Sequence, residues 1–265
     1  MKLILSRKGF DSGAGGGPSP ILPDGTLLSL PIPSRDSRRY SEVRTPAGQT
    51  CAQVMRQLGI RTRGGCHVDP DLDPDALPRA PGWRAAFGSV GAAGRHLQLQ
   101  GVGAGDLFLF FGWFRPTRLE QGRLRFEAGP DLHVIFGYLQ VGDLLRVGPE
   151  ARLPEWLADH PHAAPARRSS PGNTIYLAAP RLTLAGTGGP GAGLLPYARH
   201  RVLTAPDHSR SRWALPRRVF AGRPITYHSE KAWRDGVFHS ARRGQEFVME
   251  TDAGLRNWIA GILSN

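Results

Sequence analysis

The sequence is poor in cysteine and has no long apolar run, and both shortages bear on its class. Two cysteines, Cys51 and Cys66, are too few for a disulfide framework. No unbroken apolar run exceeds five residues, as in Leu107–Phe111, whereas a membrane-spanning helix needs about 20. The start of the chain is apolar for only three residues before Ser6, which is too short for a secretion signal. We therefore expect a cytoplasmic protein with no membrane partner.

Lysine and asparagine are also scarce. Lysine occurs only at positions 2, 8 and 231 among 34 basic residues, and asparagine only at 173, 257 and 265. This bias is typical of GC-rich coding, so a single arginine carries little information, whereas Lys8 and Asn173 carry more. The net charge of +12 favours a polyanionic partner. Residues 199–243 hold eleven basic and three acidic side chains, and this stretch faces either nucleic-acid phosphates or solvent.

The hydrophobic pattern predicts an α+β fold: a central mixed sheet with long loops and a C-terminal packing helix, in a single domain over residues 1–265. Buried strands are expected at 1–5, 107–111, 132–141 and 174–178, with a hairpin partner at 123–126. A helix is expected over 51–58, capped by Thr50 and ended by Gly59, and a closing helix over 255–263, capped by Thr251 or Asp252. Proline and glycine predict loops at 13–20, 31–39, 64–82 and 184–196.

The segment Ser6-Arg7-Lys8-Gly9-Phe10-Asp11 follows the first predicted strand and enters a glycine-rich loop. It places two cations, a carboxylate and unshielded backbone N–H groups at one strand end. Such groups bind phosphates and ribose hydroxyls. The residue order is not that of a Walker loop. A solvated loop after an edge strand is the alternative interpretation.

The loop His67-Val68-Asp69-Pro70-Asp71 combines one histidine with two carboxylates. These residue types bind divalent cations or supply an acid/base pair. The remaining ligands of a calcium loop are missing, and no second histidine stands at a zinc-finger spacing. An ordinary proline-rich turn is the competing interpretation.

Three further segments carry polar candidates. His160-Pro161-His162 precedes Asn173 at the start of a predicted strand, and His96 follows spaced glycines at 88–94. A dinucleotide fingerprint is excluded at 101–106, because these glycines precede a strand instead of opening a helix. Gln245 and Glu246 stand directly before an apolar strand, so one of them faces inward. Glu246 either serves as an acid/base or pairs with Arg242 or Arg243 at the surface.

Taken in order, the segments 6–11 with 16–21, 67–72, 103–115 and 243–248 resemble the nucleotide modification associated domain 3 family. The resemblance runs over nearly the whole chain. It implies work on nucleotides or nucleic-acid bases in modified-base systems of bacteria and phages, and it does not supply the reaction or a cofactor.

We therefore expect an enzyme that acts on a nucleotide or on a base in nucleic acid (DNA included), as a transferase that moves a glycosyl or other group. Arg7 and Lys8 would hold phosphate, Asp11 a hydroxyl, and Asp69 or Glu246 would be the acid/base. The catalytic candidates are Lys8, Asp11, Asp69 and Glu246, and the substrate-binding candidates are Ser6, Arg7, His67, His96, His162, Asn173, Arg243 and Gln245.

Two other functions stay open. The first is a metal-dependent phosphodiesterase or nuclease that uses His67, Asp69 and Asp71. The second is a non-catalytic reader of modified nucleic acid, bound through the basic stretch 199–243 with steep salt dependence.

Overall fold

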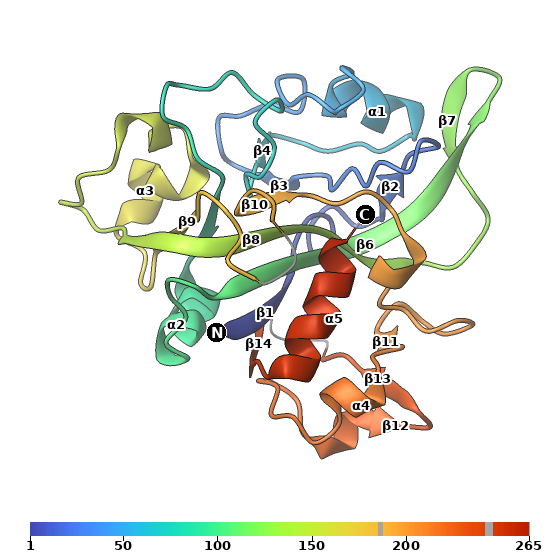
Figure 1. Ribbon diagram of the computed structural model, residues 1–265. Coiled ribbons are helices and arrows are strands. Elements are labelled where there is room, and N and C mark those ends of the chain that lie inside the picture. The colour runs from blue at the N-terminus through green and yellow to red at the C-terminus, as the bar shows by residue number, and fades with distance from the viewer. Residues whose placement is uncertain (185–187, 242–245, 265) are drawn as a thin grey trace.

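Two long antiparallel strands, β6 (Leu107–Glu120) and β8 (Leu132–Arg146), form the centre of the sheet (Figure 1). The computed structural model describes residues 1–184, 188–241 and 246–264. The main sheet has the order β14-β1-β6-β8-β9-β5. Its other strands are β1 (Lys2–Arg7), β5 (Ala86–Ser89), β9 (Thr174–Ala178) and β14 (Glu246–Glu250).

The sheet is mixed because β1 runs parallel to β6 and antiparallel to β14. Three short strands extend it: β2 (Ser19–Ile21) and β7 (Arg123–Phe126) pair with β6, and β10 (Ala192–Leu194) pairs with β8. The predicted α+β class, with a mixed sheet and a C-terminal helix, is confirmed. The strands predicted at 107–111 and 132–141 are real but longer than expected.

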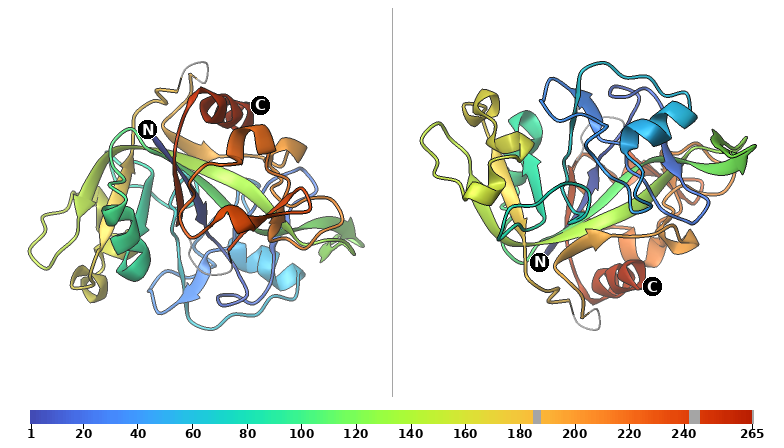
Figure 2. Two further views of the ribbon diagram at one scale, coloured as in Figure 1. Left: turned by 90° about the horizontal axis from the view of Figure 1, so that it is seen from below. Right: turned by 90° about the horizontal axis from the view of Figure 1, so that it is seen from above.

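Each face of the sheet carries its own core, because side chains alternate along each strand. Leu3 and Leu5 face the helix α5 (Ala253–Leu263), while Ile4 packs with Phe108 and Phe110 on the opposite face. Figure 2 shows α5 and α1 (Cys51–Gln57) on opposite sides of the sheet. The same alternation directs Ser6 and Lys8 to the face of Ile4.

The two predicted helices begin where the sequence indicates. Thr50 and Gln53 form a capping box at the start of α1, and Gly59 follows its end with φ +70°. Asp252 caps α5 by accepting a hydrogen bond from the Leu255 N–H at 2.8 Å. Both helices can be predicted from the sequence, because their capping residues and apolar spacing lie within or directly beside each helix.

The prediction of loops at 31–39 and 64–82 is wrong at two places. Short strands β3 (Ile32–Ser34) and β4 (Gly65–His67) pair antiparallel there. Three-residue strands carry no periodic signal, and a proline is tolerated in an edge strand such as β3. Likewise β10 lies inside the predicted loop 184–196.

Helix α2 (Gly91–Leu99) is not predicted from the sequence, because glycine-rich segments are poor helix formers. Leu97 is fully buried in the core, and Gly94 packs so closely that an added Cβ would lie 2.3 Å from the Gly172 carbonyl oxygen. Tertiary packing therefore fixes this helix.

The remaining elements are short. They are α3 (Pro165–Arg168), α4 (Arg217–Phe220), 3-10 turns at Glu155–Leu157, Pro161–Ala163, Arg199–Arg201 and Glu230–Ala232, and a small sheet of β11 (Arg212–Trp213), β12 (Trp233–Arg234) and β13 (Val237–His239). Among the described residues, no helix has both the length and the apolar character that a membrane crossing needs.

Part of the basic stretch 199–243 is structural. Arg201 is 1% exposed and donates hydrogen bonds to the backbone carbonyls of Pro196, Ile262 and Ser264. It thereby satisfies carbonyl groups at the end of α5, where a cation also opposes the helix dipole. Arg223 similarly bonds the Glu250 carbonyl and pairs with Asp252.

Candidate functional site

A polar cavity of about 170 Å³ lies beside the end of β1. Of the side chains singled out from the sequence, those at its wall are Arg7, Lys8, Asp11, His67, Asp69 and His162. They come from the end of β1, the loop after it, the end of β4, the loop that follows, and the turn Pro161–Ala163. The fold therefore gathers residues that lie up to about 150 positions apart in sequence.

Lys8 is held by a buried carboxylate. Its Nζ lies 2.7 Å from Glu246 Oε1, and the two side chains are 12% and 1% exposed. Nζ also lies 4.5 Å from the ring centroid of Phe87, a favourable cation–π distance. Ser6, which is fully buried, stands opposite Glu246 in the β1–β14 register. Glu246 therefore lies behind Lys8, and Lys8 is the member of the pair at the cavity.

Asp69 is surrounded by three imidazoles. Its Oδ2 lies 3.9 Å from His67 Nε2 and 3.8 Å from His162 Nε2, and its Oδ1 lies 3.5 Å from His160 Nε2. Oδ1 also accepts a hydrogen bond of 2.7 Å from the Gly88 N–H. The two carboxylate oxygens thus have different surroundings: Oδ1 is bonded to the protein, and Oδ2 faces two imidazole nitrogens.

The far nitrogens of two of these imidazoles are fixed from outside. His67 Nδ1 lies 2.8 Å from Asp36 Oδ2, and Arg167 pairs with the same carboxylate. His162 Nδ1 lies 2.9 Å from Asn173 Oδ1. The Asn173 amide nitrogen donates to the carbonyls of His162 and Arg167, so its oxygen must be the atom that accepts from His162. Both rings are therefore locked in orientation.

The pKa values agree with an ionised Asp69 beside a neutral His162. Burial by itself raises the pKa of Asp69, but the His160 hydrogen bond and the surrounding imidazoles outweigh it and hold this pKa well below its usual range. Burial lowers the pKa of His162 to about 4, against the opposing pull of Asp69. Burial also opposes ionisation of Asp36, yet the hydrogen bonds from His67 and Arg167 bring its pKa well below the ordinary value.

Helix α2 begins at the wall of this cavity. Its N-cap residue, Val90, supplies no side-chain hydrogen bond, and Ser89, Val90 and Ala93 line the cavity. The first turn of a helix has N–H groups without helical partners and the positive end of the helix dipole; in α2 one of them, the Gly91 N–H, donates to the Pro171 carbonyl at 2.8 Å. The cavity therefore combines this helix start with two cationic side chains, an arrangement suited to an anionic group.

A larger basin of about 840 Å³ shares Arg7 and Asp11 with the cavity. Its wall includes Trp113, His133 and Arg210, and the Arg210 guanidinium lies 3.9 Å from the Trp113 ring centroid. This volume falls in the range of small-molecule sites. Asp11 also shapes the loop, since its Oδ1 accepts hydrogen bonds from the backbone N–H groups of residues 13 and 14 at 2.7 and 2.8 Å.

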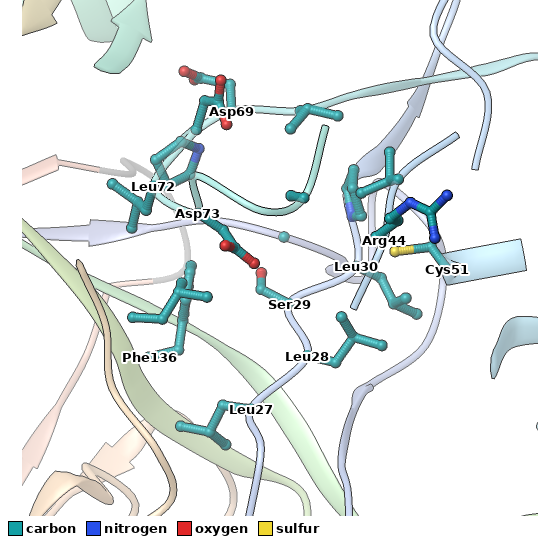
Figure 3. Close-up of a pocket in the computed structure, with 18 of the residues that line it drawn as sticks. Leu27, Leu28, Ser29, Leu30, Arg44, Cys51, Asp69, Leu72, Asp73 and Phe136 are labelled. Carbon is teal, nitrogen blue, oxygen red and sulfur yellow. The ribbon is translucent and has the colours of Figure 1, made fainter. Parts of the chain in front are cut away.

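A third cavity, of about 90 Å³, lies between the loop 68–73 and the segment 27–31 (Figure 3). Leu27, Leu28 and Phe136 give it apolar walls, and the side chains of Ser29 and Asp73 point toward each other. It touches the polar cavity only through Gly9 and Asp69, which line both. Its apolar walls make it a poorer candidate for chemistry than the polar cavity.

Several predicted site residues lie away from the cavity wall. Asn173 stands behind His162. His96, on α2, hydrogen-bonds Thr226 at 3.1 Å and packs against the Tyr227 ring. Arg243 and Gln245 lie outside the described residues. Asp71, which the metal-dependent alternative required, is instead held by Arg79, whose nitrogens lie 2.7 and 2.6 Å from its two carboxylate oxygens.

The sequence interpretation missed Asp36, Gly88 and Arg167. Asp36 stands in a charged run that looked like solvated loop, and its partner His67 lies 31 positions away. Gly88 is needed because an added Cβ would lie 2.2 Å from the His162 ring. His160 lies in the segment His160-Pro161-His162, of which only His162 is a substrate-binding candidate by sequence. No local pattern marks these residues, because each acts through a tertiary contact.

A comparison with models of protein families shows to which family the chain belongs. The model of nucleotide modification associated domain 3 matches residues 2–250. The chain belongs to this family. No curated protein and no solved structure matches it significantly. The name nucleotide modification associated domain 3 indicates an association with nucleotide modification systems, and the matched span contains every cavity residue named above.

Proposed function

We propose that this protein is an enzyme that transfers a group to or from a nucleotide, or a base in nucleic acid. One observation carries the proposal: the polar cavity holding Lys8 and Asp69 shares Arg7 and Asp11 with a basin large enough for a nucleotide. The family's association with nucleotide modification supports the same substrate class.

The basin would hold the nucleotide. Arg7 and Arg210 supply positive charge for its phosphate, and the Trp113–Arg210 stack offers a flat surface for a base. Asp11, which lies between basin and cavity, accepts a hydrogen bond from a sugar hydroxyl. These contacts orient the reacting atom toward the smaller cavity, and positioning of this kind supplies much of the rate enhancement in group transfer.

The smaller cavity would hold the reacting atom. Lys8 stabilises negative charge that develops there, and Glu246 keeps its ammonium in place. Asp69 is the proton acceptor by its position, because its carboxylate lies at the wall of the cavity. The start of α2 adds backbone N–H groups for an oxyanion. Lys8 and Asp69 therefore act on the substrate, while Glu246 acts through Lys8.

The test compares modified nucleosides by mass spectrometry. Nucleosides from DNA, from RNA and from the free nucleotide pool are measured in cells that express the wild-type chain, Lys8→Met, or the control Lys2→Met. Lys2 pairs with Glu250 at 3.7 Å on the same two strands but near the surface. We expect a nucleoside whose abundance changes with the wild type and Lys2→Met and does not change with Lys8→Met.

Equal nucleoside profiles in all three cultures would overturn the proposal. New strand ends without altered bases would instead indicate a phosphodiesterase. Binding that weakens steeply with salt, without any turnover, would indicate a reader of nucleic acid.

A further inference from the structure

Three potential metal-ligand atoms converge in the polar cavity. His67 Nε2, His162 Nε2 and Asp69 Oδ2 all lie within 4.8 Å of one another. Ligands around a transition ion with bonds of about 2.0–2.2 Å stand roughly 3–3.5 Å apart. Shifts of about 1 Å, within the range of side-chain rotation, would therefore bring the three atoms into a coordination sphere.

The hydrogen bonds of the two histidines direct their Nε2 atoms toward the centre of this group. Asp36 accepts at His67 Nδ1, and the Asn173 oxygen accepts at His162 Nδ1. A ring that donates from Nδ1 to such an acceptor keeps Nε2 as the atom that can bind an ion. In both rings that Nε2 faces the Asp69 carboxylate, so the three potential ligand atoms point toward one another.

The outer contacts match those of protein metal centres. Metal-bound histidines usually donate their other N–H to a carboxylate or carbonyl, which fixes the ring and raises its basicity. His67 does so to Asp36, which Arg167 anchors, and His162 does so to Asn173. Each outer residue is thus held by contacts of its own.

His160 belongs to the support of Asp69 and is not a ligand. Its Nδ1 accepts a hydrogen bond from the His162 N–H at 3.2 Å, so its Nε2 carries the proton and faces Asp69 Oδ1. The Gly88 N–H donates to Oδ1 at 2.7 Å and His160 Nε2 lies 3.5 Å from the same oxygen, which leaves Oδ2 for an ion. The ligand set therefore has two nitrogens and one oxygen.

We propose that His67, Asp69 and His162 bind a divalent first-row transition ion, with open coordination positions toward Lys8 and the start of α2. Two imidazoles with one carboxylate suit zinc, iron, cobalt or nickel better than magnesium or calcium. Three protein ligands leave positions for water and substrate, as catalytic metal sites do, and the cavity of about 170 Å³ has room for them. This site goes beyond the proposed group transfer: an ion on Asp69 Oδ2 would take that oxygen from the role of proton acceptor given to it above, whereas the roles of Lys8 and of the basin would be unchanged.

The test is a titration of the purified full chain, freed of metal by a chelator, with Co²⁺ and separately with Zn²⁺. We expect one Co²⁺ per chain by mass spectrometry and calorimetry, and visible cobalt bands without a thiolate charge-transfer band, because Cys51 and Cys66 are not in the cluster. Asp69→Asn and His162→Ala should weaken binding by about 100-fold or more. The control His96→Ala should leave it within about threefold, because His96 is not in the cluster.

Absence of stoichiometric binding to the wild type would overturn the proposal, and so would equal affinity in Asp69→Asn and His96→Ala. Circular dichroism of each variant separates loss of the site from loss of the fold. The wild-type cobalt spectrum tests the donor set even if a variant fails to fold. Since the readout is binding alone, its failure is distinguishable from failure of the proposed enzymatic function.

Discussion

Lys8 Nζ lies 2.7 Å from Glu246 Oε1, and this buried ion pair joins two positions 238 apart in the chain. The same two strands carry a second lysine–glutamate pair near the surface, Lys2 with Glu250 at 3.7 Å. The two pairs have the same chemistry, and both link β14 to β1 or to the residue that follows it directly, but they differ in burial. They therefore form a natural comparison.

Removing one member of the buried pair should destabilise the protein. Lys8→Met leaves the Glu246 carboxylate buried without its cation, at a cost on the order of 3 kcal/mol. Glu246→Gln in addition removes that charge, so the double variant should recover much of the stability and stay inactive. Lys2→Met should cost less than about 1 kcal/mol. Urea unfolding of the four proteins measures these differences, and equal costs for Lys8→Met and Lys2→Met would contradict the assignment.

The residues that accept hydrogen bonds from the two ligand histidines should affect the metal affinity of the site. Asn173→Ala removes the acceptor of His162, and Asp36→Asn replaces the charged acceptor of His67 with a neutral amide; such changes weaken metal binding by about 10–100-fold. We expect that loss in a cobalt titration. A comparable exposed change, Asp75→Asn, should have no effect. Unchanged affinity in Asp36→Asn would show that the Asp36–His67 contact does not orient the ring.

Gly88 should tolerate no side chain. An alanine Cβ there would lie 2.2 Å from the His162 ring, so Gly88→Ala must displace that ring and with it a proposed ligand. We expect loss of cobalt binding. Gly261→Ala, in α5 with no atom within 4 Å of the added Cβ, should preserve binding and add up to about 1 kcal/mol of stability, since alanine favours helix. Intact cobalt binding in Gly88→Ala would contradict the crowding.

His133 should make stability depend on pH. Burial, and then the charges of Arg7 and Arg210, lower its pKa to about 3, whereas the unfolded value is about 6.5. The unfolded chain therefore binds the extra proton first as the pH falls. The part of the unfolding free energy that depends on a neutral His133 is fully present above about pH 6.5. It is lost as the pH falls toward 3, at about 1.4 kcal/mol per pH unit.

The variant His133→Gln keeps an acceptor for the Trp213 indole N–H, which lies 3.1 Å from His133 Nδ1. Between pH 7 and pH 5 the wild type should lose about 2 kcal/mol more than this variant. Urea unfolding at both pH values measures the difference. Parallel losses in the two proteins would mean that His133 is not the group responsible.

Arg210 should matter for nucleotide binding more than other arginines of the basic stretch. It lines the basin and stacks on Trp113, whereas Arg217 lies near Trp233, 5.3 Å from that ring. Loss of a charge-assisted contact to phosphate costs about 1.5–3 kcal/mol, so Arg210→Ala should weaken binding of a nucleoside monophosphate by about tenfold or more. Calorimetry should show no such loss for Arg217→Ala, and equal losses would place the phosphate elsewhere.

Local patterns made a large part of the fold predictable. The apolar strands at 107–111 and 132–141, and the helix caps at Thr50 and Asp252, are signals that lie within one element. The β3–β4 pair and α2 were missed because their stability comes from tertiary contacts. A glycine-rich helix such as α2 gives no propensity signal, and it forms because Leu97 is buried and Gly94 allows close packing.

Residue type indicated several residues that line the polar cavity, but not how they pair. Lys8, His67, Asp69 and His162 were chosen for their chemistry, and all four line one cavity. The partnership of Lys8 with Glu246 follows from the β1–β14 register, which no short-range pattern encodes. For the same reason the surface pairing considered for Glu246 with Arg242 or Arg243 looked equally reasonable, although Glu246 is buried against Lys8.

The pairing of β1 with β14 also determines when the Lys8–Glu246 ion pair can form during synthesis of the chain. Lys8 is translated before its carboxylate partner, which is added 238 residues later. At a synthesis rate of about 5–20 residues per second, roughly 10–50 s pass between the addition of Lys8 and that of Glu246. During that interval β1 can align with β6 but lacks its other neighbour. The buried position of Lys8 in the nascent chain thus lacks its counter-charge until Glu246 has been translated.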